Sequence, residues 1–366
     1  MMGGGTGTLF RYISRHFLFN FLGLTLILLG LIYVFDAIEL LRRAADRPEL
    51  SFGLVLSMAA MKLPMVGQEI IPFAVLFAAI YTCWKLNKTS ELVVIRAAGL
   101  SAWQFLAPMV ASAFGIGLLT TMAVNPVGSI MLSKYAQMEI VHLQKTDNLV
   151  TVSRTGIWLR QPAEDGGYAL LHAETFAQKE WRLGDVIVLF FDRDDTFQKR
   201  IDSPVVLLKD GFWDMQNALI NTPSGAERQP RLSLPTELTA DKIEESFADP
   251  ETISFWQIPA YIRIMTETGF PGTRLAIHFQ SLLAQPFLLA AMILLAATFS
   301  LRPQRIGGTA LMITLGVAVG FFIFFMESIL QAFGISQKIP VSLAAWTPAL
   351  VSLLLGTTAL LHMEDG

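Results

Sequence analysis

Six apolar stretches, each long enough to cross a bilayer, constrain this chain more than any other feature of its sequence. A transmembrane helix needs about 20 consecutive, mostly apolar residues. Three such stretches precede a long polar interval and three follow it, at residues 17–38, 54–84, 102–124, 277–301, 309–333 and 341–361. We therefore expect a polytopic α-helical membrane protein with six transmembrane helices and one inserted domain.

The composition agrees with this class and excludes several others. Only 16% of the residues are charged, against about 25% in soluble globular domains. The net charge of -3 is too small to indicate a nucleic-acid partner. The single cysteine, Cys83, excludes an intrachain disulfide and a cysteine-rich metal site. The sequence has no phosphate-binding loop, no metal-ligand spacing and no catalytic cluster, so we expect no catalytic residue and no metal site in this chain.

The polar interval between the third and fourth apolar segments predicts an inserted antiparallel β domain. Short runs of alternating apolar and polar residues are separated by turn sequences, among which we count RLGD at residues 182–185. In one such run, Trp158 and Leu159 are expected on opposite faces of a strand. We interpret residues 222–242 as a polar connection. Residues 254–272 are expected to form a short amphipathic helix that ends at Gly269 and leads back into the membrane.

These segments divide the chain into three parts. Residues 1–125 hold three transmembrane helices, residues 126–272 the β-rich domain, and residues 273–366 three further helices. Short basic flanks are enriched on the cytoplasmic side of membrane proteins. The basic residues that decide the orientation are Arg11, Arg15, Lys85, Lys88, Arg96, Arg302 and Arg305. They place both termini in the cytoplasm and the β domain on the opposite side of the membrane.

The segment TSELVVIRAAGL, residues 89–100, predicts a short cytoplasmic helix between the second and third apolar segments. A hydroxyl of Thr89 or Ser90 is expected to cap its first N–H groups. Glu91 near the helix start is favoured by the helix dipole. Leu92, Val93 and Ile95 offer an apolar face to a partner groove. The alternative is a capped linker at the membrane interface without a partner.

Charged residues follow or interrupt the apolar segments at three places. Arg42 and Arg43 lie on the non-cytoplasmic side, where guanidinium groups can bind the phosphates of a lipid headgroup. The alternative is local pairing with Asp36, Glu39 or Asp46. Lys62 either faces a polar cavity or extends to the interface, and helical spacing suggests Glu69 as its partner. For Glu327 we hypothesise a pair with Arg42 or Arg43 that substrate phosphate displaces.

The fifth apolar segment combines small and aromatic residues. Gly316 and Gly320 form a pair that lets helices approach closely. Phe321 and Phe324 follow on one helix face. These two phenylalanines could line a binding surface for lipid chains, or they could simply face the bilayer or pack in the core.

Several of these stretches together resemble the YjgP/YjgQ family, the permease subunits of the bacterial lipopolysaccharide export ABC transporter. The likeness runs from about Leu9 to Leu361. It is carried by LFRYISRHFLFNFLGLTLILL and DAIELLRR at the first apolar segment, by SELVVIRAAGLS, and by HFQSLLAQPFLLAAMILLAATFSLRP in the fourth. Of the two paralogous branches, the chain is more similar to LptG than to LptF.

The resemblance implies a half-transporter of the bacterial inner membrane with a jellyroll-like periplasmic domain. It would extract lipopolysaccharide from the membrane and pass it to a periplasmic bridge, driven by ATP hydrolysed in another subunit. The implied partners are an LptF-like permease, a cytoplasmic LptB-like ATPase dimer and an LptC/LptA-like bridge. ATP and Mg would be bound by the ATPase, so this chain itself would be neither an enzyme nor a cofactor-binding protein.

The resemblance also gives roles to individual residues. Glu91 matches the carboxylate with which the family meets the ATPase, and the arginine pair matches basic residues used against the lipopolysaccharide headgroup. The first and fifth apolar segments are expected to line the lipid cavity. The candidates for ATPase coupling are Glu91, Leu92, Val93, Arg96 and Gly99, and those for substrate binding are Arg42, Arg43, Lys62, Phe321 and Phe324.

Two other classes of protein stay open on the residues alone. One is a polytopic lipid-modifying enzyme that uses the inserted domain for catalysis, and the other is a membrane-anchored sensor or assembly scaffold. A transporter subunit should co-purify with an ATPase and retain a phosphorylated glycolipid, whereas an enzyme should turn over lipid by itself.

Overall fold

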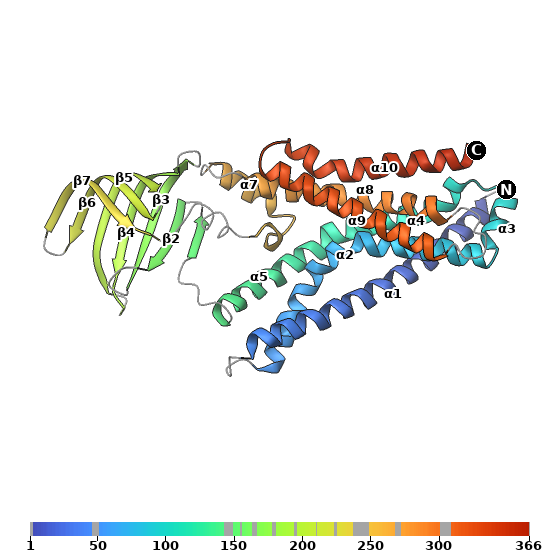
Figure 1. The fold of residues 1–366 in the computed structure, drawn as a ribbon, viewed down its shortest axis with the longest axis horizontal. Coiled ribbons are helices and arrows are strands. Elements are labelled where there is room, and N and C mark those ends of the chain that lie inside the picture. Colours follow the sequence, from blue (N-terminus) through green and yellow to red (C-terminus); the bar gives the residue numbers. More distant parts are fainter. Residues whose placement is uncertain are drawn as a thin grey trace. The chain divides into compact units, whose positions relative to one another are not determined.

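A computed structural model gives the fold of the chain as two compact units (Figure 1). The residues it describes are 3–45, 51–142, 149–153, 156–162, 167–177, 181–193, 196–209, 211–222, 225–236, 249–267, 272–300 and 309–365. One unit comprises residues 1–138, 251–256 and 273–366, and the other comprises residues 139–250 and 257–272.

The first unit is built from long helices. They are α1 (Gly3–Ala44), α2 (Phe52–Lys88), the short α3 (Glu91–Ala97), α4 (Ala102–Leu119), α5 (Asn125–His142), α8 (Thr273–Ser300), α9 (Thr309–Ile335) and α10 (Val341–Asp365). Within the described residues, six helical stretches are long and apolar enough to cross a membrane. The prediction of six transmembrane helices is therefore confirmed. Both chain termini lie at the same end of this unit (Figure 1), as an even number of spans requires.

The third transmembrane helix is longer than its apolar stretch. Helices α4 and α5 are joined without a break through a π-helical turn, η1 (Thr120–Val124). The fully buried Asn125 follows this turn, and its side chain is satisfied on both sides. Asn125 Oδ1 accepts a hydrogen bond from the backbone N–H of Phe255 at 2.9 Å, and Asn125 Nδ2 donates to Gln68 Oε1 at 3.3 Å. These bonds hold the chain before α8 against the middle of the third and second spans.

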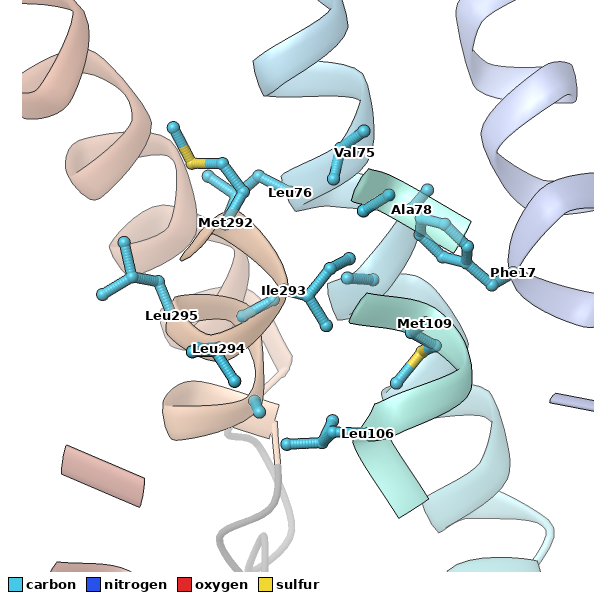
Figure 2. Packing of buried hydrophobic residues seen from close by; sticks show 14 of the residues in the cluster. Phe17, Val75, Leu76, Ala78, Leu106, Met109, Met292, Ile293, Leu294 and Leu295 are labelled. Atoms are coloured by element: carbon cyan, nitrogen blue, oxygen red, sulfur yellow. The ribbon is translucent and has the colours of Figure 1, made fainter. Parts of the chain in front are cut away.

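The core of the helical unit is organised around α8, which is buried along most of its length. Figure 2 shows its residues Met292 to Leu295 packed with Leu76 of α2 and with Leu106 and Met109 of α4. Small residues allow the close approach. A Cβ atom added to Gly117 of α4 would lie 2.5 Å from the Cα of Pro286 in α8. Such contacts carry helix association in a bilayer, where apolar side chains gain little by leaving lipid.

The second unit is a seven-stranded antiparallel sheet whose strands neighbour one another in chain order. The strands are β1 (Leu149–Ser153), β2 (Gly156–Pro162), β3 (Tyr168–Ala177), β4 (Arg182–Phe191), β5 (Phe197–Lys209), β6 (Phe212–Thr222) and β7 (Gly225–Pro235). Alternating residues such as Leu171, Val188 and Met215 form the core. Leu159 is buried and Trp158 is half-exposed, as expected. The predicted antiparallel β domain between two sets of helices is confirmed.

Two details of the insert were predicted wrongly. The polar connection at residues 222–242 contains strand β7, which pairs only with β6 at the edge of the sheet and exposes most of its side chains. Backbone pairing alone defines such a strand, so the apolar pattern fails to reveal it. RLGD belongs to β4 rather than to a turn, since Arg182, Leu183 and Gly184 pair with β3. Asp185 has a positive φ of 51° within this strand.

The short amphipathic helix is present as α7 (Ile258–Glu267), after the 3-10 turn η3 (Pro250–Thr252). The predicted helix end at Gly269 lies outside the described residues. Met265 of α7 packs against the core of the sheet, which ties this helix to the β domain.

Candidate coupling helix and charged groups

Helix α3 begins without the predicted side-chain cap. Ser90 precedes the helix in a left-handed conformation with φ of 61°, and its hydroxyl makes no capping hydrogen bond. The Thr89 hydroxyl is also engaged elsewhere, since it donates to Glu91 Oε1 at 2.8 Å. Gly99, with φ of 80°, follows the end of α3 and turns the chain toward α4. A side-chain cap is present at the start of the next helix, α4. There the Ser101 hydroxyl accepts from the Gln104 N–H, and the Gln104 side chain accepts from the Ser101 N–H, which together form a capping box.

Glu91 is the residue that connects α3 to the first transmembrane helix. The hydroxyl of Tyr12 on α1 donates a hydrogen bond to Glu91 Oε2 at 2.9 Å. Together with the bond from Thr89, both carboxylate oxygens are therefore occupied. The contact with Tyr12 was not predicted, because the two residues are 79 positions apart and no local pattern relates them.

The two faces of α3 have different surroundings. Leu92 and Ile95 are buried and belong to the core of the helical unit. Val93 and Val94 are 61% and 68% exposed. Arg96 and Gly99 are exposed as well. Of the five predicted coupling residues, Leu92 therefore anchors α3 to this chain, whereas Val93, Arg96 and Gly99 face outward; the outward Val94 was missed.

The far end of α1 carries a cluster of one carboxylate and two guanidinium groups. Arg42 binds Glu39 through two nitrogens, each 3.0 Å from a carboxylate oxygen, and Arg43 Nε lies 3.0 Å from Glu39 Oε1. The side chains of Arg42 and Arg43 are 77% and 51% exposed. The local pairing with Glu39 that the sequence left as an alternative is thus formed, and both arginines also reach solvent.

Lys62 pairs with a residue other than the predicted one. Its Nζ lies 3.4 Å from Asp36 Oδ2 on α1 and 5.5 Å from the ring centre of Tyr135 on α5. The expected pair with Glu69 is not formed. The lysine therefore ties three helices together, because α1, α2 and α5 each contribute one of these groups.

Helix α9 packs against α2 through its small residues and exposes aromatic ones. A Cβ atom on Gly316 would lie 2.4 Å from Ile80 Cδ1, which confirms the predicted close approach. Phe321 and Phe324 share a face, since both rings contact Phe73 of α2 at centroid distances of 6.0 and 5.9 Å. Both are also half-exposed or more, so one aromatic face is open to a lipid or a partner helix.

Glu327, one turn beyond these phenylalanines, does not pair with Arg42 or Arg43. Gln331 Nε2 donates to its Oε1 at 3.2 Å. Glu327 also lines a hollow of about 290 Å³, together with His278 and Gln285 of α8. The hypothesised pair with Arg42 or Arg43 is therefore absent from this structure.

A second cluster of one carboxylate and two cations lies in the β domain and was missed entirely. Asp214 of β6 binds Arg231 of β7 through both carboxylate oxygens, with Arg231 Nε 2.6 Å from Oδ1. Lys209 Nζ of β5 lies 2.7 Å from Oδ2. The hydrogen bonds from Arg231 and Lys209 hold the pKa of Asp214 well below its usual range. The pKa of Arg231 is raised by the same carboxylate.

A polytopic helical membrane protein with an inserted antiparallel sheet is the class that this fold defines. Comparison with known families is more specific, because residues 11–362 match the lipopolysaccharide export system permease family LptF/LptG. The chain belongs to this family, and the resemblance stated from the sequence is confirmed.

Individual relatives point to one branch of the family. The lipopolysaccharide export system permease protein LptG of Haemophilus influenzae is 22% identical over 362 residues, which cover 95% of this chain and 96% of the relative. The protein of the same name from Escherichia coli K12 is 22% identical over 354 residues, 94% of this chain and 95% of the relative. This agrees with the closer similarity to LptG than to LptF.

Proposed function

We propose that this chain is a permease subunit that extracts lipopolysaccharide from the inner membrane with the energy of ATP hydrolysed by a separate cytoplasmic subunit. An LptF-like permease would complete the membrane pathway, and an LptC/LptA-like protein would receive the lipid in the periplasm. The proposal rests on membership of a family of lipopolysaccharide export permeases and on the arrangement of α3.

Helix α3 has the properties of an element that receives force from a partner. Its inward side chains, Leu92 and Ile95, fix it to the helical core. Its outward valines, Val93 and Val94, are exposed in this chain. Their apolar surface would be buried if they entered a groove of another protein. Glu91 is bound to α1 through Tyr12. A displacement of α3 would therefore move α1 as well, and this link is the observation that carries the proposal.

The opposite end of α1 supplies the groups for a phosphorylated lipid. Arg42 and Arg43 combine permanent positive charge with exposure to solvent. A lipid phosphate can replace the Glu39 carboxylate as their bidentate acceptor. Phe321 and Phe324 offer an apolar wall for acyl chains on α9. The apolar core of the inserted sheet would take over the acyl chains in the periplasm.

The coupling step can be tested with two substitutions in the assembled transporter. Val94→Asp places a charge in the outward apolar face of α3 and should lower co-purification of the ATPase by about tenfold or more. Tyr12→Phe removes only the hydroxyl that holds Glu91. It should leave the ATPase bound but lower the lipid extracted per ATP hydrolysed about threefold to tenfold.

Tyr33→Phe is the matched control for the tyrosine substitution. Tyr33 lies on the same helix, and its hydroxyl donates to the Leu56 carbonyl at 3.3 Å. Tyr33→Phe therefore removes one tyrosine hydrogen bond at a place that is not in contact with α3. Equal coupling losses in the two tyrosine variants would argue against the link through Glu91. Turnover of lipid by the purified chain without an ATPase would instead support a membrane enzyme and refute the transport proposal.

A further inference from the structure

The hollow of about 290 Å³ beside Glu327 lies among helices α2, α8, α9 and α10 and is lined by several carboxylates. Glu69 of α2, Glu251 of η3 and Glu327 of α9 contribute them, so they come from three different elements. Every residue that lines the hollow belongs to the helical unit. Its volume is close to the lower limit of ligand pockets in proteins, about 300–1,000 Å³. We call it the acidic hollow.

Negative groups outnumber positive ones in the acidic hollow. Among the described residues that line it, His278 of α8 is the one side chain that can carry a positive charge, since no lysine or arginine is present there. Three carboxylates therefore face at most one cationic group of the chain. Carboxylates at membrane depth are stabilised by a nearby positive charge, so the acidic hollow favours a cationic ligand.

Two lining side chains also have polar atoms left for a ligand. Gln331 Nε2 donates to Glu327 Oε1 at 3.2 Å, and within the part of the chain that the structure describes no hydrogen bond or ion pair reaches Glu327 Oε2. The hydroxyl of Ser281 on α8 is enclosed and has no hydrogen-bond partner among the described residues. Buried polar groups in native proteins almost always have a partner. Both side chains therefore suit a ligand that forms hydrogen bonds.

The arrangement of the acidic groups suits an organic ammonium ion better than a metal ion. Within the described ranges of the chain, no three acidic, histidine or cysteine side chains form a group that could hold a metal ion. A primary ammonium group instead carries three N–H donors that point in different directions. It can therefore bind oxygens that lie on different helices, which is how the carboxylates of this hollow are distributed.

The rest of the lining is suited to the apolar part of a lipid. Leu282 and Leu288 of α8 and Phe324 of α9 line the same hollow, and Phe324 is 50% exposed. Helix α9 has 27 residues, about 40 Å, which spans a bilayer together with its headgroups. Glu327 lies about 12 Å from the last residue of α9 along the helix, near the boundary between headgroups and hydrocarbon. A headgroup in the hollow would thus leave its acyl chains beside Phe324.

We propose that the acidic hollow binds the primary ammonium group of a lipid headgroup, with Glu69, Glu251 and Glu327 as its acceptors. The ammonium group can belong to an aminophospholipid of the membrane or to an amine-substituted lipopolysaccharide, because the two carry the same group. This site is separate from Arg42 and Arg43, to which the proposed function assigns phosphate. The inference goes beyond that function and does not depend on ATP hydrolysis.

Native mass spectrometry of the full-length chain, in the assembly in which it purifies, tests the site. The chain is released from nanodiscs with equal amounts of phosphatidylethanolamine and phosphatidylglycerol, and the ratio of the two retained lipids is measured. The unaltered chain should favour phosphatidylethanolamine. Glu327→Gln keeps the size of the side chain and an acceptor for Gln331 but removes the charge, so it should lower the ratio about threefold to tenfold. Glu69→Gln/Glu327→Gln should lower it about tenfold or more.

Two further variants serve as controls. Glu327→Asp keeps the charge and should retain most of the preference. Glu174→Gln makes the same chemical change at an exposed position of β3 and should leave the ratio unaltered. Because both lipids are measured in one sample, the ratio does not depend on the amount of folded protein.

A second arm of the experiment supplies lipopolysaccharide with and without an ethanolamine substituent in equal amounts. A preference that depends on Glu327 with the phospholipids assigns the site to an aminophospholipid, and one with the lipopolysaccharides assigns it to the exported lipid.

Two results would overturn the proposal. One is the same ratio for the unaltered chain and Glu327→Gln in both arms, and the other is an equal loss of preference in Glu174→Gln and Glu327→Gln. Neither result depends on ATP-driven extraction, so the transport function and the ammonium site fail separately.

Discussion

Among the residues that the structure describes, one carboxylate in the β domain and one on α1 are each bound by two basic side chains. Asp214 binds Lys209 and Arg231, and its side chain is 1% exposed. Glu39 binds Arg42 and Arg43, and its side chain is 41% exposed. The two clusters have the same number of charges and similar distances between nitrogen and oxygen atoms. They differ in the burial of the carboxylate.

Burial decides what each cluster can do. In the cluster around Asp214 only the carboxylate is buried, since the Lys209 and Arg231 side chains are 43% and 64% exposed. Removal of its partners would leave a buried charge without compensation, so Asp214 links β5, β6 and β7. An exposed ion pair contributes little to stability and is easily exchanged for water or another anion. The cluster around Glu39 is therefore suited to release its arginines to a ligand. Four predictions test this comparison.

The largest expected effect is on the stability of the β domain. In Asp214→Asn, the amide N–H₂ would face donors of Arg231 and Lys209 instead of accepting from them. We expect the unfolding temperature of the β domain to fall by about 5–10 °C, measured in the full chain by limited proteolysis of the β domain at increasing temperature. Asp202→Asn is the control, because Asp202 pairs with Arg200 on the same sheet but is 28% exposed; it should shift the temperature by less than about 2 °C. Equal shifts would contradict the role given to burial.

The next effect concerns the pH dependence of the same domain. Because the folded pKa of Asp214 is lowered, its stabilising contribution is complete above the unfolded pKa of about 3.9 and is lost as the pH falls below that value. The difference in unfolding temperature between the unaltered chain and Asp214→Asn should therefore be largest above about pH 5 and shrink as the pH falls below about 3.9. Thermal unfolding at several pH values measures it, and a constant difference would show that the carboxylate is not the source.

A third prediction concerns the exposed cluster. Arg42→Gln/Arg43→Gln should reduce co-purification of lipopolysaccharide about tenfold, because charge-assisted bonds to phosphate are lost. The unfolding temperature should change little. Lys134→Gln on α5 removes an exposed cation elsewhere and serves as control. A large loss of stability with unchanged lipid binding would reverse the assignment of the two clusters.

The smallest expected effect has the opposite sign. Glu39→Gln removes the anion that competes for both arginines, so lipid retention should rise about twofold. Quantitative mass spectrometry of the bound lipid can resolve this change. A decrease would indicate that Glu39 positions the arginines for the ligand rather than competing with it.

The sequence predicted those features that follow from local pattern. The six spans could be found because a bilayer demands continuous apolar helices, and the glycines of α9 because close helix packing requires small residues. The ionic cluster around Asp214 could not be predicted, because it depends on the register of the strands. Lys209 and Arg231 each lie two residues from the position directly opposite Asp214, a diagonal neighbour relation that appears only once the strands are paired.

The candidate coupling site was predicted in position but not in detail. Glu91 and the outward Val93 follow from a short helix between two spans. The contact with Tyr12 depends on how α1 packs beside α3, which no spacing encodes. The partner of Lys62 was assigned wrongly from helical spacing, because the neighbouring helix α1 supplies Asp36. The hypothesised pair of Glu327 with Arg42 or Arg43 is also wrong, because Gln331, one turn on in the same helix, binds Glu327.

The unbroken course of α1 has a mechanical consequence. Helix α2 contains Pro64 and Pro72, whereas α1 has no proline among its 42 residues. A helix without proline keeps an unbroken ladder of backbone hydrogen bonds, so a displacement at Tyr12 can be carried along the backbone to Arg43, about 46 Å away. A rotation or a translation at one end of α1 can then reach the other end through the backbone, without a series of side-chain rearrangements between the two ends.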